Sequence, residues 1–145
     1  MRVDFYHLTE GSAETALPLI ARRTLDIGEK LLIVSRDRGQ LERICGELWS
    51  RLPGTFLAHG VAGQEHATRQ PILLSHEASP INGARFIAIA DGEWREADPP
   101  FSRTFYLFDA ASVNPARECW RQLGQREGVE RRYWKQEGGR WREGP

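Results

Sequence analysis

The chain has 145 residues, a mass of 16.5 kDa and 40% hydrophobic residues, which is the size and composition of one soluble domain. Arg and Lys balance Asp and Glu at 20 each, so the chain lacks the overall basic charge of a general nucleic-acid binder. The charge is uneven, however: residues 117–145 hold eight Arg or Lys and five Glu, which indicates a local anionic partner for this end. We expect a single domain over residues 1–145, with a polar, basic C-terminal extension over about 128–145.

Cysteine usage and hydropathy both predict a cytoplasmic protein. Cys45 and Cys119 are far apart and form no Cys-x-x-Cys pair, so each is expected to be a buried free thiol. No early apolar run resembles a signal peptide, and none approaches the roughly 20 residues that a membrane helix needs. No membrane partner is therefore expected.

The pattern of apolar residues predicts alternating strands and helices. In chain order we predict a strand at 3–8, a helix at 13–26, a strand at 31–34, a helix between Asp37 and Pro53, strands at 72–75, 85–90 and 104–108, and a helix at 114–127. Ser12 is the expected N-cap of the first helix, which tolerates Pro18 best in its first turn. Pro115 is expected at the first position of the last helix.

This order of elements indicates an α/β/α sandwich, a three-layer α/β fold with a mainly parallel central sheet. The run at 31–34 is apolar throughout, as in a strand covered on both faces. Residues 51–70 form a long Gly-rich connection of the kind that often carries function. The last dozen residues are polar and are expected to project from the core.

No nucleotide-binding motif fits these elements. The turn after the first strand, Thr9–Ser12, has one Gly and no Lys, so it is not a P-loop. Gly60 and Gly63 have neither the spacing nor the preceding strand of a dinucleotide fingerprint. The sequence therefore predicts no cofactor.

Metal and hydrolase motifs are also missing. The histidines are scattered outside any His-Glu-x-x-His pattern, and no serine lies in a Gly-x-Ser-x-Gly elbow. His59 and His66 share a loop with Glu65, but we expect His59 to hydrogen-bond the loop backbone rather than to bind zinc. We predict neither a metal site nor a catalytic residue.

Two aromatic features remain. Trp49 ends the second helix and Phe56 follows it; such residues are either core or exposed interface anchors. Arg117, Trp120 and Arg121 lie at i, i+3 and i+4, so they share one helical face. Two guanidinium groups beside an indole could bind a carboxylate that is attached to an apolar or aromatic group. The alternative is that this helical face is solvated and binds nothing, with Trp120 packed on the core.

A series of short motifs spans nearly the whole chain. In order these are Phe5-Tyr6-x-Leu8, Leu48-Trp49, Phe56-Leu-Ala-His-Gly-Val-Ala-Gly63, Gln70-Pro-Ile-Leu-Leu74, Leu107-Phe-Asp109, Ala116-Arg-Glu-x-Trp-Arg121, Tyr133-Trp-Lys-Gln136 and Gly139-Arg-Trp141. In this order and spacing they resemble the chi subunit of the bacterial DNA polymerase III holoenzyme. The resemblance implies a fold shaped like nucleotide-binding domains but without a P-loop.

It also implies a function, that of a non-catalytic accessory subunit of the clamp-loader complex. Such a subunit bridges the psi subunit and the acidic C-terminal tail of single-stranded DNA-binding protein, and meets DNA mainly indirectly. By this resemblance the psi-binding residues are Trp49, Phe56 and His59, and the tail-binding residues are Arg117, Trp120 and Arg121. Val113 stands where some members have Lys, which removes a positive charge, and Ala58 replaces a Pro.

Two other functions compete with this adaptor role. A direct single-stranded nucleic-acid-binding protein would use aromatic platforms in a basic groove, to which Trp134, Trp141, Arg132 and Arg140 could contribute. A small nucleotide-dependent enzyme would need a phosphate-binding turn, which the sequence lacks.

Overall fold

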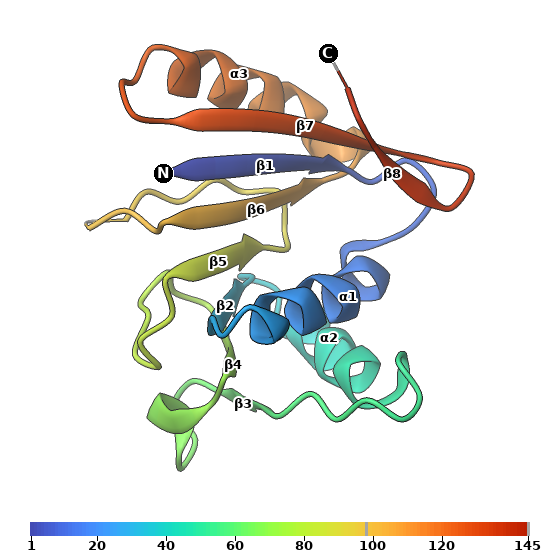
Figure 1. The fold of residues 1–145 in the computed structure, drawn as a ribbon, viewed down its shortest axis with the longest axis vertical. Coiled ribbons are helices and arrows are strands. Elements are labelled where there is room, and N and C mark those ends of the chain that lie inside the picture. The colour runs from blue at the N-terminus through green and yellow to red at the C-terminus, as the bar shows by residue number, and fades with distance from the viewer. Residues whose placement is uncertain (98, 145) are drawn as a thin grey trace.

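The computed structural model describes residues 1–97 and 99–144, which form one mixed sheet with helices on both faces (Figure 1). In chain order the elements are β1 (Arg2–His7), α1 (Ala13–Asp26), β2 (Leu31–Val34), α2 (Arg38–Ser50), β3 (His59–Val61), the 3-10 turn η1 (Ala67–Arg69), β4 (Ile72–Ser75), β5 (Phe86–Ile89), β6 (Arg103–Phe108), the 3-10 turn η2 (Ala110–Ser112), α3 (Val113–Gly124), β7 (Glu130–Glu137) and β8 (Arg140–Glu143). The strands lie in the order β3-β4-β2-β5-β6-β1-β7-β8. All neighbours are parallel except β7 and β8. The predicted α/β class is confirmed.

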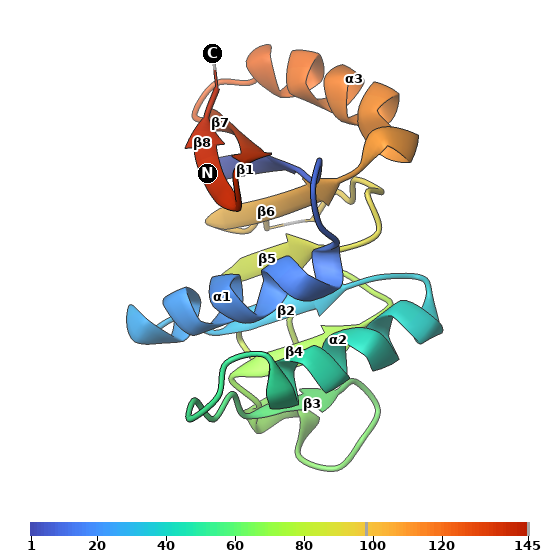
Figure 2. The ribbon, with the colours of Figure 1, turned by 90° about the vertical axis from the view of Figure 1, so that its right-hand side faces the viewer.

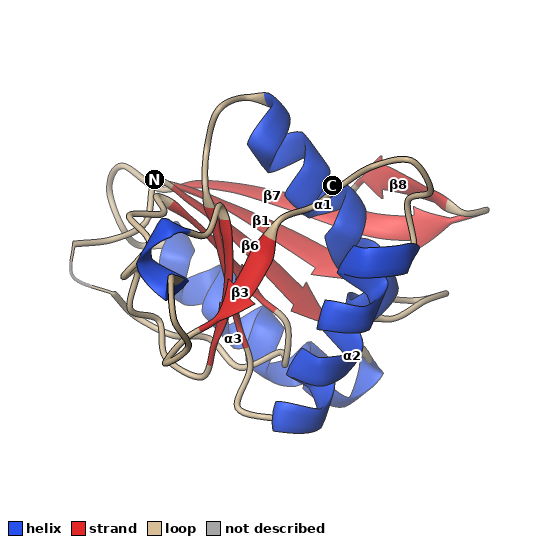
Figure 3. Ribbon diagram, turned by 90° about the horizontal axis from the view of Figure 1, so that it is seen from below, coloured by secondary structure: helices blue, strands red, loops and turns tan. Residues whose placement is uncertain are grey.

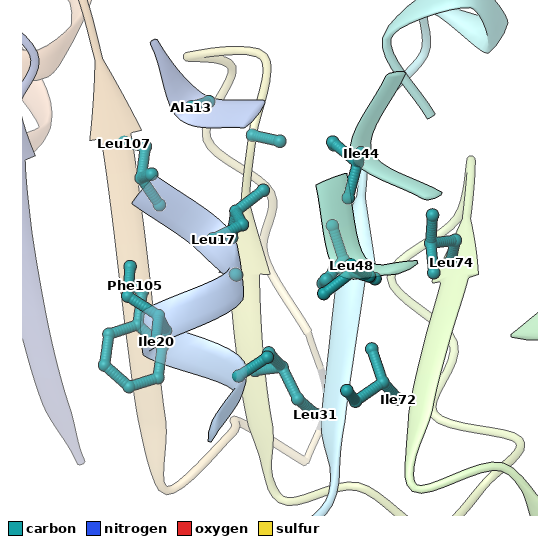
Figure 4. Close-up of a cluster of buried hydrophobic side chains, with 14 of the residues drawn as sticks. Ala13, Leu17, Ile20, Leu31, Ile44, Leu48, Ile72, Leu74, Phe105 and Leu107 are labelled. Atoms are coloured by element: carbon teal, nitrogen blue, oxygen red, sulfur yellow. The ribbon is translucent and has the colours of Figure 1, made fainter. Parts of the chain in front are cut away.

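Apolar side chains fill both faces of the sheet. α1 and α2 cover one face, where Leu17 and Leu48 pack with strand residues such as Leu31 (Figure 4). α3 lies on the other side, as Figure 3 shows, and buries Cys119 and Leu123. β2 is buried along its whole length, as predicted for a strand covered on both faces. Burying one large aliphatic side chain of this kind contributes about 1.5–3 kcal/mol.

The start of α1 follows the expected capping chemistry, but Pro115 lies deeper in α3 than predicted. Ser12 caps α1 in a capping box with Thr15. Pro18 lies in the second turn of α1, not in the first turn, where it would be tolerated best, and its missing N–H costs one intrahelical hydrogen bond. Pro115 is the third residue of α3, not the first, because α3 begins at Val113, directly after η2. Three N–H groups at a helix start need no intrahelical partner, so Pro is tolerated there.

The prediction that the C-terminal residues project from the core was wrong. β7 pairs in parallel with β1, and β8 folds back on β7 as a hairpin. Trp141 packs edge-to-face on Tyr6, with ring centroids 4.9 Å apart. Trp134 donates a hydrogen bond from Nε1 to the buried carboxylate of Asp4. These contacts make β7 part of the fold rather than an extension, because the edge of β1 would otherwise be unpaired.

The long connection at 51–70 is partly ordered as β3 and η1, which the sequence did not predict. β3 forms the far edge of the sheet beside β4 and carries His59 next to the end of α2. Within the described residues, none of the helices combines the length and apolar character needed to cross a membrane.

Candidate functional site

A groove lies between α3 and the strands that it covers. Its volume is about 700 Å³, and the residues that line it are Phe5, Phe108, Asn114, Ala116, Arg117, Glu118, Trp120, Arg121 and Tyr133. These come from β1, β6, α3 and β7, so residues far apart in the sequence form one cavity. Aromatic rings make its floor and charged groups of α3 make its rim.

Trp120 forms part of the groove and is held from two sides. Its ring packs edge-to-face against Phe5, with centroids 5.1 Å apart. The guanidinium of Arg131 lies 4.3 Å from the centre of the indole and donates a hydrogen bond of 2.7 Å to the Trp120 carbonyl. Trp120 is therefore half-buried, neither fully core nor free, and its orientation is fixed before any ligand arrives.

The two arginines of the predicted face differ in their surroundings. Arg121 forms an ion pair with Glu118 on the same helix. Among the described residues, Arg117 makes no such pair, and its charge instead acts on His7 and Tyr133 across the groove. The sequence places both arginines on one face, but only the structure shows that Arg117 has the free positive charge.

Tyr133 lines the groove and His7 contacts it from outside the lining; the sequence analysis selected neither as a site residue. Nδ1 of His7 lies 2.8 Å from the hydroxyl oxygen of Tyr133, and the imidazole stacks on Phe108 at 4.8 Å. Burial, then the charges of Lys135 and Arg117, lower the pKa of His7. Lys135 pairs with His7 in the register of β1 and β7. A positive charge of β7 thus lies near His7, beside the groove.

A second feature lies at the other end of the molecule, where α2 meets β3. Trp49 is 61% exposed and Phe56 is 72% exposed, so both are surface residues rather than core. Their rings lie 5.9 Å apart, and Trp49 packs edge-to-face on His59 at 5.0 Å. The structure therefore brings together the residues that we call the aromatic patch: Trp49, Phe56 and His59.

His59 is held by two hydrogen-bonding contacts at the edge of this patch. Nδ1 lies 2.8 Å from the carbonyl oxygen of Leu57, which confirms the expected bond to the loop backbone. Nε2 lies 3.0 Å from Sγ of Cys45, a contact that the sequence did not predict. Across the part of the chain that the structure describes, no group of three or more His, Cys, Asp or Glu could hold a metal ion.

Figures 1 and 2 show that α3, β1 and β7 lie at one end of the sheet and β3 at the other, so the groove and the aromatic patch lie apart. The groove belongs to the end of the sheet formed by β1 and β7, and the patch to the end formed by β3. The fold and surfaces thus define an α/β/α domain with a cation-rimmed aromatic groove and a separate exposed aromatic patch.

The model of the family described as DNA polymerase III chi subunit, HolC, matches residues 1–130, so the chain belongs to this family. A comparison with curated proteins gives no match. Family membership gives the chain an accessory role in DNA replication, as a component of DNA polymerase III. The match ends where β7 begins, so Tyr133 and Lys135 lie outside it.

Proposed function

We propose that this chain is a non-catalytic adaptor that links the clamp-loader complex to single-stranded DNA-binding protein. It would bind the psi subunit through the aromatic patch and the acidic C-terminal tail of single-stranded DNA-binding protein through the α3 groove. The observation that carries this proposal is the groove itself. It combines an aromatic floor with an arginine, Arg117, that is paired with no acidic group of the described residues.

The chemistry of the groove suits a chain end with an apolar aromatic residue and a free carboxylate. Trp120 is half-buried and offers part of its ring to an aromatic side chain, with the buried rings of Phe5 and Phe108 behind it. Arg117 can pair with a carboxylate through two parallel hydrogen bonds, and no acid among residues 1–97 and 99–144 forms an ion pair with it. Arg121 would have to share its guanidinium with Glu118, so it contributes less.

Acidic residues further back along the tail need additional positive charge. Val113 packs against the apolar core and offers none. Lys135 lies beside His7 in the register of β1 and β7, and its charge lowers the pKa of His7; it is the residue that we assign to this role. A cation from β7 would thus replace the lysine that some members of the family have at the start of α3.

The separation of the two surfaces supports bridging. Aromatic side chains are frequent energetic centres of protein interfaces, and Trp49 and Phe56 are exposed together. Because the groove lies at the other end of the sheet, both partners could be bound at once. DNA would then be reached mainly through single-stranded DNA-binding protein.

The internal contacts of the C-terminal tryptophans favour this adaptor over a direct strand-binding protein. Trp134 stacks on Tyr6 and donates its Nε1 hydrogen to Asp4. Trp141 packs against the same tyrosine. Aromatic platforms for single-stranded bases need a free face, and these two rings are used within the fold.

A pull-down tests the tail-binding half of the proposal. Immobilised chain should retain intact single-stranded DNA-binding protein and release it when an acidic peptide with the tail's terminal aromatic residue is added. A tail-truncated protein should not be retained. Equal retention of both forms, or retention that depends on added oligonucleotide alone, would show that the groove does not bind the tail.

A further inference from the structure

We infer that Cys45 and His59 form an activated thiol site, at which Cys45 is modified by low-molecular-weight disulfides. The two side chains come from α2 and β3 and are 14 residues apart in the sequence. Their Sγ and Nε2 atoms lie 3.0 Å apart. Neither residue belongs to the α3 groove.

The neighbouring backbone fixes which nitrogen of His59 acts as the base. A carbonyl oxygen only accepts hydrogen bonds, so the 2.8 Å contact with the Leu57 carbonyl requires a hydrogen on Nδ1. In the neutral imidazole the lone pair is then on Nε2, which points at the thiol of Cys45. A nucleophile, a base and a group that orients the base thus form one chain of contacts, which is the arrangement that activates nucleophilic side chains.

The other cysteine has a different environment. Cys119 is 7% exposed, and burial raises the pKa of its thiol to about 12. Cys45 is only half-buried, and its Sγ contacts a titratable nitrogen. Because Cys45 is accessible and has a base beside its sulfur, whereas Cys119 is buried, we expect the exchange at Cys45.

The modification is a thiol–disulfide exchange. The proton on Sγ of Cys45 moves to Nε2 of His59, and Sγ attacks one sulfur of a disulfide RSSR. A Cys45 S–SR bond forms while the RS–SR bond breaks. The departing sulfur takes the proton from Nε2 and leaves as RSH, so one thiol is oxidised and half of the disulfide reagent is reduced.

A group attached to Cys45 would lie at the aromatic patch. Trp49 follows Cys45 by four residues on α2, so the two share one helical face, and its ring packs on His59. Thiolation would therefore compete with any partner that docks on the patch. This consequence rests on the proposed binding of psi, whereas the reactivity of the thiol does not.

Reaction kinetics with glutathione disulfide test the site. A Cys119→Ser chain has Cys45 as its only thiol, and intact-mass spectrometry follows formation of the mixed disulfide. A matched control carries Cys45→Ser, Cys119→Ser and Ser50→Cys, which puts the thiol on an exposed position of the same helix. An ordinary thiol is only a few per cent thiolate near neutral pH, so Cys45 should react at least about tenfold faster than this control.

His59→Asn in the Cys119→Ser chain should lower the rate by about tenfold, because Asn can keep the bond to Leu57 but provides no base. A rate that is unchanged or raised, in a chain with the wild-type circular dichroism spectrum, would show that His59 does not activate the thiol. If this variant does not fold, the comparison of Cys45 with the Ser50→Cys control decides the matter, and equal rates overturn the inference.

The effect on the patch is tested with the same Cys119→Ser chain before and after thiolation. If the untreated chain captures psi and the thiolated chain does not, the result supports competition between thiolation and docking at the aromatic patch. Equal capture by both forms would overturn it and leave psi binding intact. If the untreated chain captures no psi, the proposed docking fails, and the reaction rates still decide whether Cys45 is activated.

Discussion

The unequal surroundings of Arg117 and Arg121 lead to a quantitative prediction about the tail peptide. Arg117→Ala removes a guanidinium that pairs with no acid in the described structure. A hydrogen bond to a charged group contributes about 1.5–3 kcal/mol, so Kd should rise roughly 10- to 150-fold. Arg121→Ala removes a group already paired with Glu118 at an exposed site, so its effect should stay below about fivefold.

The assay is fluorescence anisotropy with a labelled acidic peptide that ends in a free aromatic residue, at moderate salt. Arg22→Ala is the matched control, because it removes the same charge from an exposed position on α1, on the opposite face of the sheet. Glu118→Gln should bind the peptide a few times more tightly, since it releases Arg121 and removes a repelling charge. Amidation of the peptide's terminal carboxylate should weaken binding to wild type about as much as Arg117→Ala does.

The outcome that contradicts this argument is specific. If Arg117→Ala and Arg22→Ala lower affinity equally, binding depends on net charge and not on the groove. If Arg121→Ala has the larger effect, the ion pair with Glu118 does not decide which arginine is available.

Other predictions concern the patch, the histidine of the groove and the C-terminal hairpin. Phe56→Ala should weaken psi binding with little change in Tm, and a large loss of stability would assign that ring to the core. Leu48, on the adjoining helix, is only 2% exposed, so Leu48→Ala should destabilise the fold by about 2–5 kcal/mol. His7 has a pKa below its ordinary 6.5 in the folded chain, so the unfolded chain binds the proton more readily. Stability should therefore fall as pH drops below about 6.5, and His7→Gln should reduce this slope in thermal unfolding; an unchanged slope would exclude His7 as its source. Trp141→Ala should lower Tm because its ring packs on Tyr6, and an unchanged Tm would show that the hairpin is not part of the cooperative fold. Calorimetry with ATP, GTP and NAD should show no saturable heat, and a magnesium-dependent signal would contradict the lack of a phosphate-binding turn.

The central part of this fold could be predicted because its signals are local. The run at 31–34 is apolar at every position, and the structure buries all of β2. Helical spacing and the cap at Ser12 predicted the bounds of α1 to the residue. The same spacing placed Arg117, Trp120 and Arg121 on one face of α3, because the period of a helix follows from the backbone alone.

The last two strands were not predicted, because β7 has no apolar pattern of a buried strand; the Gly138-Gly139 loop between them, with both φ angles positive, is the local signal that could have indicated the hairpin. β7 reads Glu-Arg-Arg-Tyr-Trp-Lys-Gln-Glu, with charges at both ends and two adjacent aromatic residues in its middle. What makes it a strand is the edge of β1, which β7 covers along its length. The apolar pattern of this segment does not reveal the strand, since the pairing that sets its place in the sheet is with β1, more than a hundred residues away in the chain.

The sequence by itself determined the layers of the sandwich, the helical face with its two arginines, and the two exposed aromatic residues as candidates for an interface. Only the tertiary structure decided that Arg121 pairs with Glu118 while Arg117 pairs with no acid of the described residues, that Tyr133 lines the groove beside His7, and that Cys45 contacts His59. Periodicity reports which residues share a face of one element. It carries no information on what the next element places opposite that face, because that depends on how strands pair across the whole sheet.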